Sequence, residues 1–98
     1  MKRANTVMKE IIAFVTQDGI LDDVSFKKNV VMKNDPRFGN FKYCKGAEAI
    51  LQYDGGSLYS IMSGEFGWGL RDAIQKIARD AGYYLEAGTN VYSGLYKN

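Results

Sequence analysis

The sequence predicts a small α+β domain, with an antiparallel sheet of five or six strands and one main helix. Short apolar runs bounded by turn residues predict the strands, and a single stretch with helical periodicity, residues 70–81, predicts the helix. The chain has 98 residues, of which 46% are hydrophobic and 24% are charged, as in one ordinary globular domain. We therefore expect a loose lead-in over residues 1–7, a single domain over residues 8–98, and the element order ββββαββ.

The first third of the chain is expected to form two strands. Apolar side chains in residues 8–16 alternate between two faces, which favours a strand. The two faces consist of Ile11, Ala13 and Val15, and of Ile12 and Phe14. The turn Gln17-Asp18-Gly19 then leads into a second run over residues 24–32, where Lys28 interrupts the apolar face and indicates an edge position or a bulge. Pro36 ends this run because it lacks the N–H that a strand ladder needs.

The middle of the chain is expected to contain a hairpin. Residues 47–53 and 57–62 are half-apolar and flank Asp54-Gly55-Gly56. Such a link favours a hairpin because glycine adopts a positive φ without steric cost. A short helical turn over residues 57–62 is the alternative, because six residues with two serines do not define a period.

The strongest pattern lies towards the C-terminus. Residues 70–81 place apolar side chains on one helical face and charged side chains on the other, and Gly82 is positioned to end the helix in a left-handed conformation. This helix is expected to cover one face of the sheet, which leaves the other face or an edge open to a partner. After the helix, two tyrosine-rich runs flank Gly88-Thr89-Asn90, which predicts a final hairpin.

Composition argues against several classes of protein. The chain has no histidine, so neither a Ser-His or Cys-His pair nor an imidazole metal site can form. We therefore expect no enzymatic activity, no cofactor and no metal. No apolar run approaches the roughly 18 residues that a membrane helix needs. The lone cysteine, Cys44, suits a reducing compartment, and we expect a cytoplasmic protein.

A glycine-rich segment precedes the main helix and has two interpretations. Gly64, Gly67 and Gly69 lie just before the helix and Arg71 lies in its first turn, so free N–H groups could hold a phosphate there. The order of these glycines differs from that of the dinucleotide and phosphate-loop motifs. The favoured interpretation is that the glycines make turns and close contacts, which let Trp68 and Phe66 pack into an edge of the core.

Basic residues gather in the first 45 positions, which hold nine Lys/Arg against five acids, whereas the remainder holds four against six. Aromatic side chains alternate with the cations between residues 26 and 45. This pattern occurs in single-stranded nucleic-acid binding, where cations contact phosphates and rings stack on bases. The residues that would serve this alternative function are Lys27, Lys28, Arg37, Phe41, Lys42 and Tyr43. A solvated loop is the favoured interpretation of the segment, with Phe41 and Tyr43 as ordinary aromatics on one strand face.

The expected function is protein binding. Seven tyrosines are abundant for this length, and tyrosine favours interfaces because it buries a large area with little loss of rotamer freedom. The expected partner-binding residues are Tyr83, Tyr84, Tyr92, Tyr96 and Trp68, although cross-strand pairing in the final hairpin explains the tyrosines equally well. By elimination, we expect a non-enzymatic phage or mobile-element accessory protein of the anti-CRISPR or anti-defence type, which inhibits a host protein by steric occlusion. Both a monomer and a homodimer are compatible with the sequence.

Overall fold

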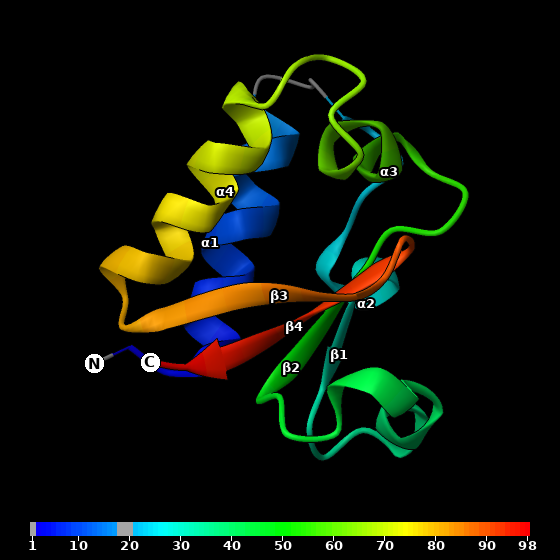
Figure 1. The fold of residues 1–98 in the computed structure, drawn as a ribbon, viewed down its shortest axis with the longest axis vertical. Helices are drawn as coiled ribbons and strands as arrows, with labels where there is room; N and C mark the ends of the chain where they lie inside the picture. The colour runs from blue at the N-terminus through cyan, green and yellow to red at the C-terminus, as the bar shows by residue number, and fades with distance from the viewer. Residues whose placement is uncertain (1, 18–20) are drawn as a thin grey trace.

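The structure, a computed structural model, describes residues 2–17 and 21–98. Within these residues the fold is built around one antiparallel sheet of four strands, in the order β1-β2-β4-β3 (Figure 1). The strands are β1 (Val30–Met32), β2 (Ala49–Gln52), β3 (Tyr83–Thr89) and β4 (Tyr92–Lys97). The α+β class and the antiparallel sheet are confirmed, whereas the prediction of five or six strands is wrong.

The first expected strand is instead a helix, α1 (Ala4–Thr16), which begins inside the expected lead-in. Its buried residues recur at the spacing of one helical face, and they are Val7, Met8, Ile11, Ile12 and Val15. The alternating pattern that predicted a strand starts at residue 8 and therefore leaves out Val7. Burial of the whole apolar stripe of the helix outweighs the β propensity of its branched side chains. Asp18 and Gly19 of the expected turn lie outside the described residues.

The second expected strand is divided between a short helix and a short strand. Helix α2 (Phe26–Asn29) begins after Ser25, whose hydroxyl oxygen accepts a hydrogen bond from the Lys28 N–H at 3.1 Å. Strand β1 follows directly. The buried Asn29 amide donates to the Gln52 carbonyl at 2.8 Å, which ties α2 to β2. This helical turn, rather than a bulge, places Lys27 and Lys28 in solvent.

The hairpin expected across Asp54-Gly55-Gly56 is wrong, because residues 57–62 form a helix, α3 (Ser57–Met62). The alternative interpretation, a short helical turn, is confirmed. Asp23 helps to fix where this helix begins, since its Oδ2 accepts hydrogen bonds from the Ser57 N–H at 2.9 Å and from the Ser57 hydroxyl at 3.0 Å. A carboxylate at the first turn satisfies N–H groups that have no partner within the helix. A residue far away in the sequence therefore favours helix over strand here.

This cap on α3 predicts a pH-dependent stability. Hydrogen bonds from the Ser57 N–H and hydroxyl lower the pKa of Asp23 below its usual 3.8. Because folding lowers this pKa, ionised Asp23 stabilises the fold above about pH 4, and the contribution is lost as the pH falls through the lowered pKa. In urea unfolding, Asp23→Asn should be less stable than wild type at about pH 6, and the difference should shrink at about pH 3. The exposed neighbour Asp22→Asn is the matched control, and an equal effect of both changes would contradict the cap.

The last third of the chain follows its sequence pattern. Helix α4 (Gly69–Asp80) buries Ile74 and Ala78, and Gly82, with φ of 87°, turns the chain from this helix into β3. Strands β3 and β4 pair as an antiparallel hairpin. The main helix and the final hairpin are therefore both confirmed.

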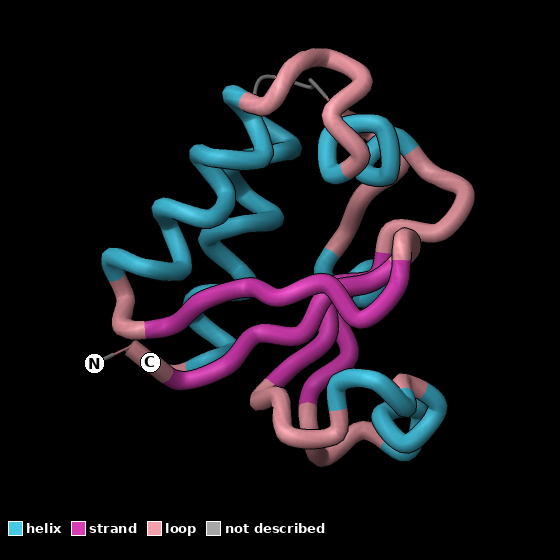
Figure 2. The backbone as a smooth tube through the Cα atoms, in the orientation of Figure 1, coloured by secondary structure: helices cyan, strands magenta, loops and turns pink. Residues whose placement is uncertain are grey.

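Both faces of the sheet carry a packed layer. Helices α1 and α4 lie side by side on one face (Figure 1), over the larger core. The opposite face packs against two 3₁₀ turns, η2 (Pro36–Asn40) and η3 (Lys42–Cys44), seen at the lower right of Figure 2. The smaller core on that side consists of Val31, Cys44, Ala47, Ile50 and Tyr92. The sheet face that was expected to be open is therefore partly closed.

Candidate functional site

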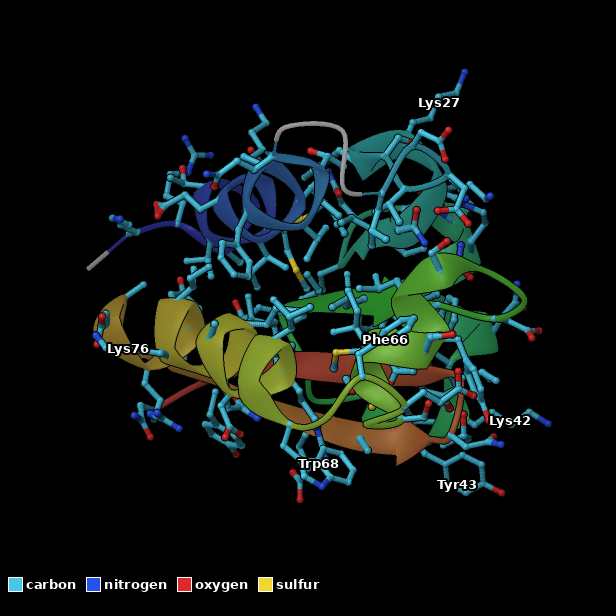
Figure 3. All side chains as sticks on the ribbon, turned by 90° about the horizontal axis from the view of Figure 1, so that it is seen from above. Lys27, Lys42, Tyr43, Phe66, Trp68 and Lys76 are labelled. Atoms are coloured by element: carbon cyan, nitrogen blue, oxygen red, sulfur yellow. The ribbon has the colours of Figure 1, made fainter. Side chains whose placement is uncertain are left out.

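Large apolar side chains are exposed between α3 and α4. Among the described residues, the most exposed side chains of this kind are Tyr43, Phe66, Trp68 and Leu70, at 74%, 70%, 53% and 37%. Three of them occupy alternate positions in the loop and at the start of α4, and we call Phe66, Trp68 and Leu70 the loop patch. Figure 3 looks down on this end of the molecule. Exposed apolar surface is unfavourable in water, so three large exposed side chains within residues 66–70 mark a candidate contact surface.

Backbone hydrogen bonds hold the loop in one shape. The Gly64 N–H donates to the Ile61 carbonyl at 3.2 Å, and the Glu65 N–H donates to the Ser60 carbonyl at 3.0 Å. These two bonds extend α3 past its last residue. The Gly67 N–H then donates to the Gly64 carbonyl at 3.0 Å and closes a turn before α4 begins. The loop therefore presents its side chains from a fixed backbone.

Glycine at position 64 allows Trp68 to pack against the loop. Gly64 has φ of +80°, and a Cβ atom there would lie 2.5 Å from the Trp68 ring. Gly67 has φ of +82° but nothing within 4 Å of an added Cβ, so only its backbone conformation requires glycine. The favoured interpretation is therefore confirmed for the turns and for the close approach of Trp68, but it is wrong for the core edge, because Phe66 and Trp68 are 70% and 53% exposed. Arg71 also stacks on the indole, with its guanidinium carbon 5.0 Å from the ring centroid.

The same geometry bears on the phosphate alternative at Gly64, Gly67, Gly69 and Arg71. Gly69 is the first residue of α4, but Asp72 occupies the first turn of that helix. A carboxylate there already compensates the positive end of the helix and repels an anion. The Arg71 cation lies against the Trp68 ring. Neither side chain favours phosphate binding at the start of α4.

The four tyrosines of the final hairpin divide between core and surface. Tyr83 and Tyr92 are buried, at 2% and 8% exposed. The Tyr83 hydroxyl donates to the Lys2 carbonyl at 2.7 Å, and the Tyr92 hydroxyl accepts from the Tyr43 N–H at 3.2 Å. These two expected anchors are therefore core residues and cannot enter a partner's pocket.

Tyr84 and Tyr96 are half-buried partners on neighbouring strands. Their rings stack with centroids 5.4 Å apart, so cross-strand pairing accounts for both. Burial raises the pKa of Tyr96 to about 12, and the adjacent Cys44 adds to the shift. The Tyr96 hydroxyl therefore stays protonated at neutral pH, where it serves as an ordinary hydrogen-bonding group.

The aromatic residues of the expected nucleic-acid segment do not form a stacking surface. Phe41 precedes and Tyr43 lies within η3, so the prediction that they share a strand face is wrong. The Phe41 ring packs edge-on against Tyr92, with centroids 4.9 Å apart. Phe41 is thereby partly buried, whereas the Tyr43 side chain is 74% exposed.

The cations of the same segment are also separated. Lys27 projects from α2, on the opposite side of the molecule from Lys42 (Figure 3). Arg37 donates two side-chain hydrogen bonds to Asp35, at 3.1 and 2.9 Å, and holds the pKa of that carboxyl at about 2. Lys28 is exposed, with its ammonium 3.1 Å from the Asp23 carbonyl. These side chains therefore do not line one continuous groove with Phe41 and Tyr43.

Sequence analysis identified Trp68 as a partner-binding residue, but it expected Phe66 at an edge of the core and Leu70 on the buried face of the helix. The local signal is that large apolar residues alternate with Gly67 and Gly69, a pattern that belongs to neither a buried strand nor a buried helical face. Their exposure also depends on α3 being a helix, because a strand over residues 57–62 would carry the loop to another place.

Neither a metal centre nor a membrane span is found in the described part of the chain. Among residues 2–17 and 21–98, no three His, Cys, Asp or Glu side chains are placed to hold a metal ion together. No helix in those ranges combines the length and the apolar character that crossing a bilayer requires.

Comparison with protein families, curated proteins and solved structures finds no match to this chain.

Proposed function

We propose that the chain is a non-enzymatic module that binds a partner protein through the loop patch. The observation that carries this proposal is the exposure of Phe66 and Trp68 on a loop with a hydrogen-bonded backbone. Trp68 already packs against Gly64 and Arg71, so its ring loses little freedom on binding and more of its burial energy appears as affinity. Tryptophan is also among the residues that most often dominate the energy of an interface.

The patch fits an apolar pocket on the partner. Phe66 and Trp68 would fill this pocket, Leu70 would lie at its margin, and Arg71 would meet a carboxylate beside it. One side of a standard interface uses about 20–30 residues, so we expect the patch to be its centre. Where the pocket belongs to a cytoplasmic host enzyme, as for an accessory protein of a phage or mobile element, occupation of the pocket inhibits that enzyme by steric occlusion.

Trp68→Ala should weaken binding of the partner by about tenfold or more, because it removes the largest side chain that the partner would bury. The partner is first captured from a host lysate on the immobilised wild-type chain, then purified. Isothermal titration calorimetry with the purified partner gives the dissociation constants of wild type and variants.

Two further variants distinguish specific binding through the loop patch from nonspecific apolar association and from misfolding. Phe66→Ala removes an aromatic ring that supports little of the fold, so its effect reports binding. Tyr43→Ala removes an equally exposed ring outside the patch and is the matched control. Circular dichroism verifies that each variant is folded. If both patch variants bind as wild type does, or if Tyr43→Ala loses as much affinity, the loop patch is not the binding site.

A further inference from the structure

A cleft separate from the loop patch gathers three cations. It is open to solvent and has a volume of about 560 Å³, and its walls come from the start of α1, the end of β1, the residue before β2, the start of β3 and the end of β4. Figure 1 shows the start of α1 close to the C-terminus at this side of the molecule. The charged residues of the lining are Arg3, Lys33, Lys97 and Glu48. Four segments distant in the sequence therefore bring three cations and one carboxylate into one cleft.

The protein neutralises these cations poorly. Lys33 and Lys97 share the two oxygens of Glu48, at 3.5 and 3.8 Å, and both lysine side chains are 60% exposed. Other ion pairs of the chain are short, with 2.6 Å for Lys2–Glu10. A charge-assisted hydrogen bond between an ammonium and a carboxylate has a length of about 2.7–2.9 Å. In the described part of the chain, the cleft cations therefore keep donors for an external anion, and Arg3 has no carboxylate partner there.

We propose that this cleft binds the phosphate group of a small phosphorylated metabolite. A phosphate monoester carries close to two negative charges at neutral pH and presents three acceptor oxygens, which suits a cleft lined by three cations and one carboxylate. Arg3 offers paired N–H donors, and the two lysines act as point charges. Met32, half-buried in the same lining, offers an apolar surface to the organic part of the ligand. The site is independent of the proposed docking function.

NMR titration of the whole chain tests the ligand class. Inorganic phosphate, adenosine monophosphate and adenosine are the three probes. We expect saturable shifts of the Asn5 and Asn34 amide resonances with the first two, tighter binding of the monophosphate, and no shifts with adenosine. Equal affinity for inorganic phosphate and the monophosphate would overturn the assignment to a metabolite, and shifts with adenosine would overturn the assignment to a phosphate group.

Charge variants test the site itself. Arg3→Gln and Lys97→Gln should each weaken phosphate binding by about tenfold, because each removes a charged donor. Glu48→Gln should tighten binding, because the carboxylate competes for the two lysines. Lys27→Gln and Asp22→Asn make the same changes of charge outside the cleft and are the matched controls. The proposal would be overturned if the cleft and control variants changed phosphate affinity equally, or if the resonance shifts did not saturate. Either result would show that only diffuse charge attracts the anion.

Discussion

Replacing Gly94 with alanine is expected to lower the free energy of unfolding by about 1–3 kcal/mol. Gly94 is buried in β4, opposite Ile50 of β2. An added Cβ atom would lie 2.9 Å from the Ala47 Cβ and 3.0 Å from both the Cβ and the Sγ of Cys44. Side-chain rotation cannot move the two Cβ atoms away, because they are fixed to the backbone. The segment that carries η3 would therefore have to separate from the sheet.

Chemical denaturation of wild type and Gly94→Ala measures this effect. The matched control is Gly39→Ala, in η2 of the same covering segment, where nothing lies within 4 Å of an added Cβ and φ is not positive. We expect the control to change stability by less than about 0.5 kcal/mol. A double-mutant cycle with Ala47→Gly should show a favourable coupling, because the smaller residue makes room for the new methyl group. If Gly94→Ala is as stable as wild type, the smaller core is loosely packed.

The parts of the fold that the sequence could predict are those with local signals, and the smaller core is not among them. Helix α4 and the final hairpin were predictable because their signals are local: a stripe of apolar residues, a closing glycine, and two tyrosine-rich runs around a turn. The 3₁₀ turns over residues 36–44 have no periodicity that a pattern can detect. Cys44 is a core residue, and Phe38 and Phe41 pack against that core, only because the sheet face lies beneath them.

The two misassigned helices have different physical causes. In α1, Ile11, Ile12 and Val15 have β propensity, yet a long amphipathic stripe that packs against α4 and the sheet determines the outcome. In α3, the six residues have no decisive preference, and Asp23 supplies the missing cap from a distant position. Both outcomes depend on tertiary contacts, which a single sequence does not contain.

The candidate site was predictable to a smaller extent than the fold. Composition alone favoured aromatic anchors, but two of the expected tyrosines, Tyr83 and Tyr92, belong to the two cores. Burial depends on which strand face each residue occupies, and that register was not known. The exposed rings of Phe66 and Trp68 follow instead from the path of a loop between two helices, one of which was expected to be a strand.

Replacing Gln75 with alanine is expected to destabilise the domain by about 1–3 kcal/mol and to open a sheet edge. Strand β3 lies at the edge of the sheet. The Gln75 side chain, from α4, accepts a hydrogen bond from the Leu85 N–H at 2.8 Å and donates one to the Leu85 carbonyl at 3.0 Å. One amide thus takes the place of a neighbouring strand. Alanine would leave both backbone groups of Leu85 without a partner, where a second copy of the chain could pair with them.

Two substitutions distinguish the loss of these hydrogen bonds from the opening of the edge. Gln75→Ala and Gln75→Lys both remove the bonds, so both should unfold at lower urea concentration than wild type. Lysine also places a charge at the edge, which disfavours strand pairing. Sedimentation velocity at increasing concentration should therefore show dimers for Gln75→Ala and monomers for Gln75→Lys. Lys76→Ala, an exposed position on the same helix, controls for changes in helix propensity. If Gln75→Ala stays monomeric at every concentration, the Gln75 amide stabilises β3 but does not protect its edge. An unpaired N–H and C=O would then be insufficient to recruit another strand.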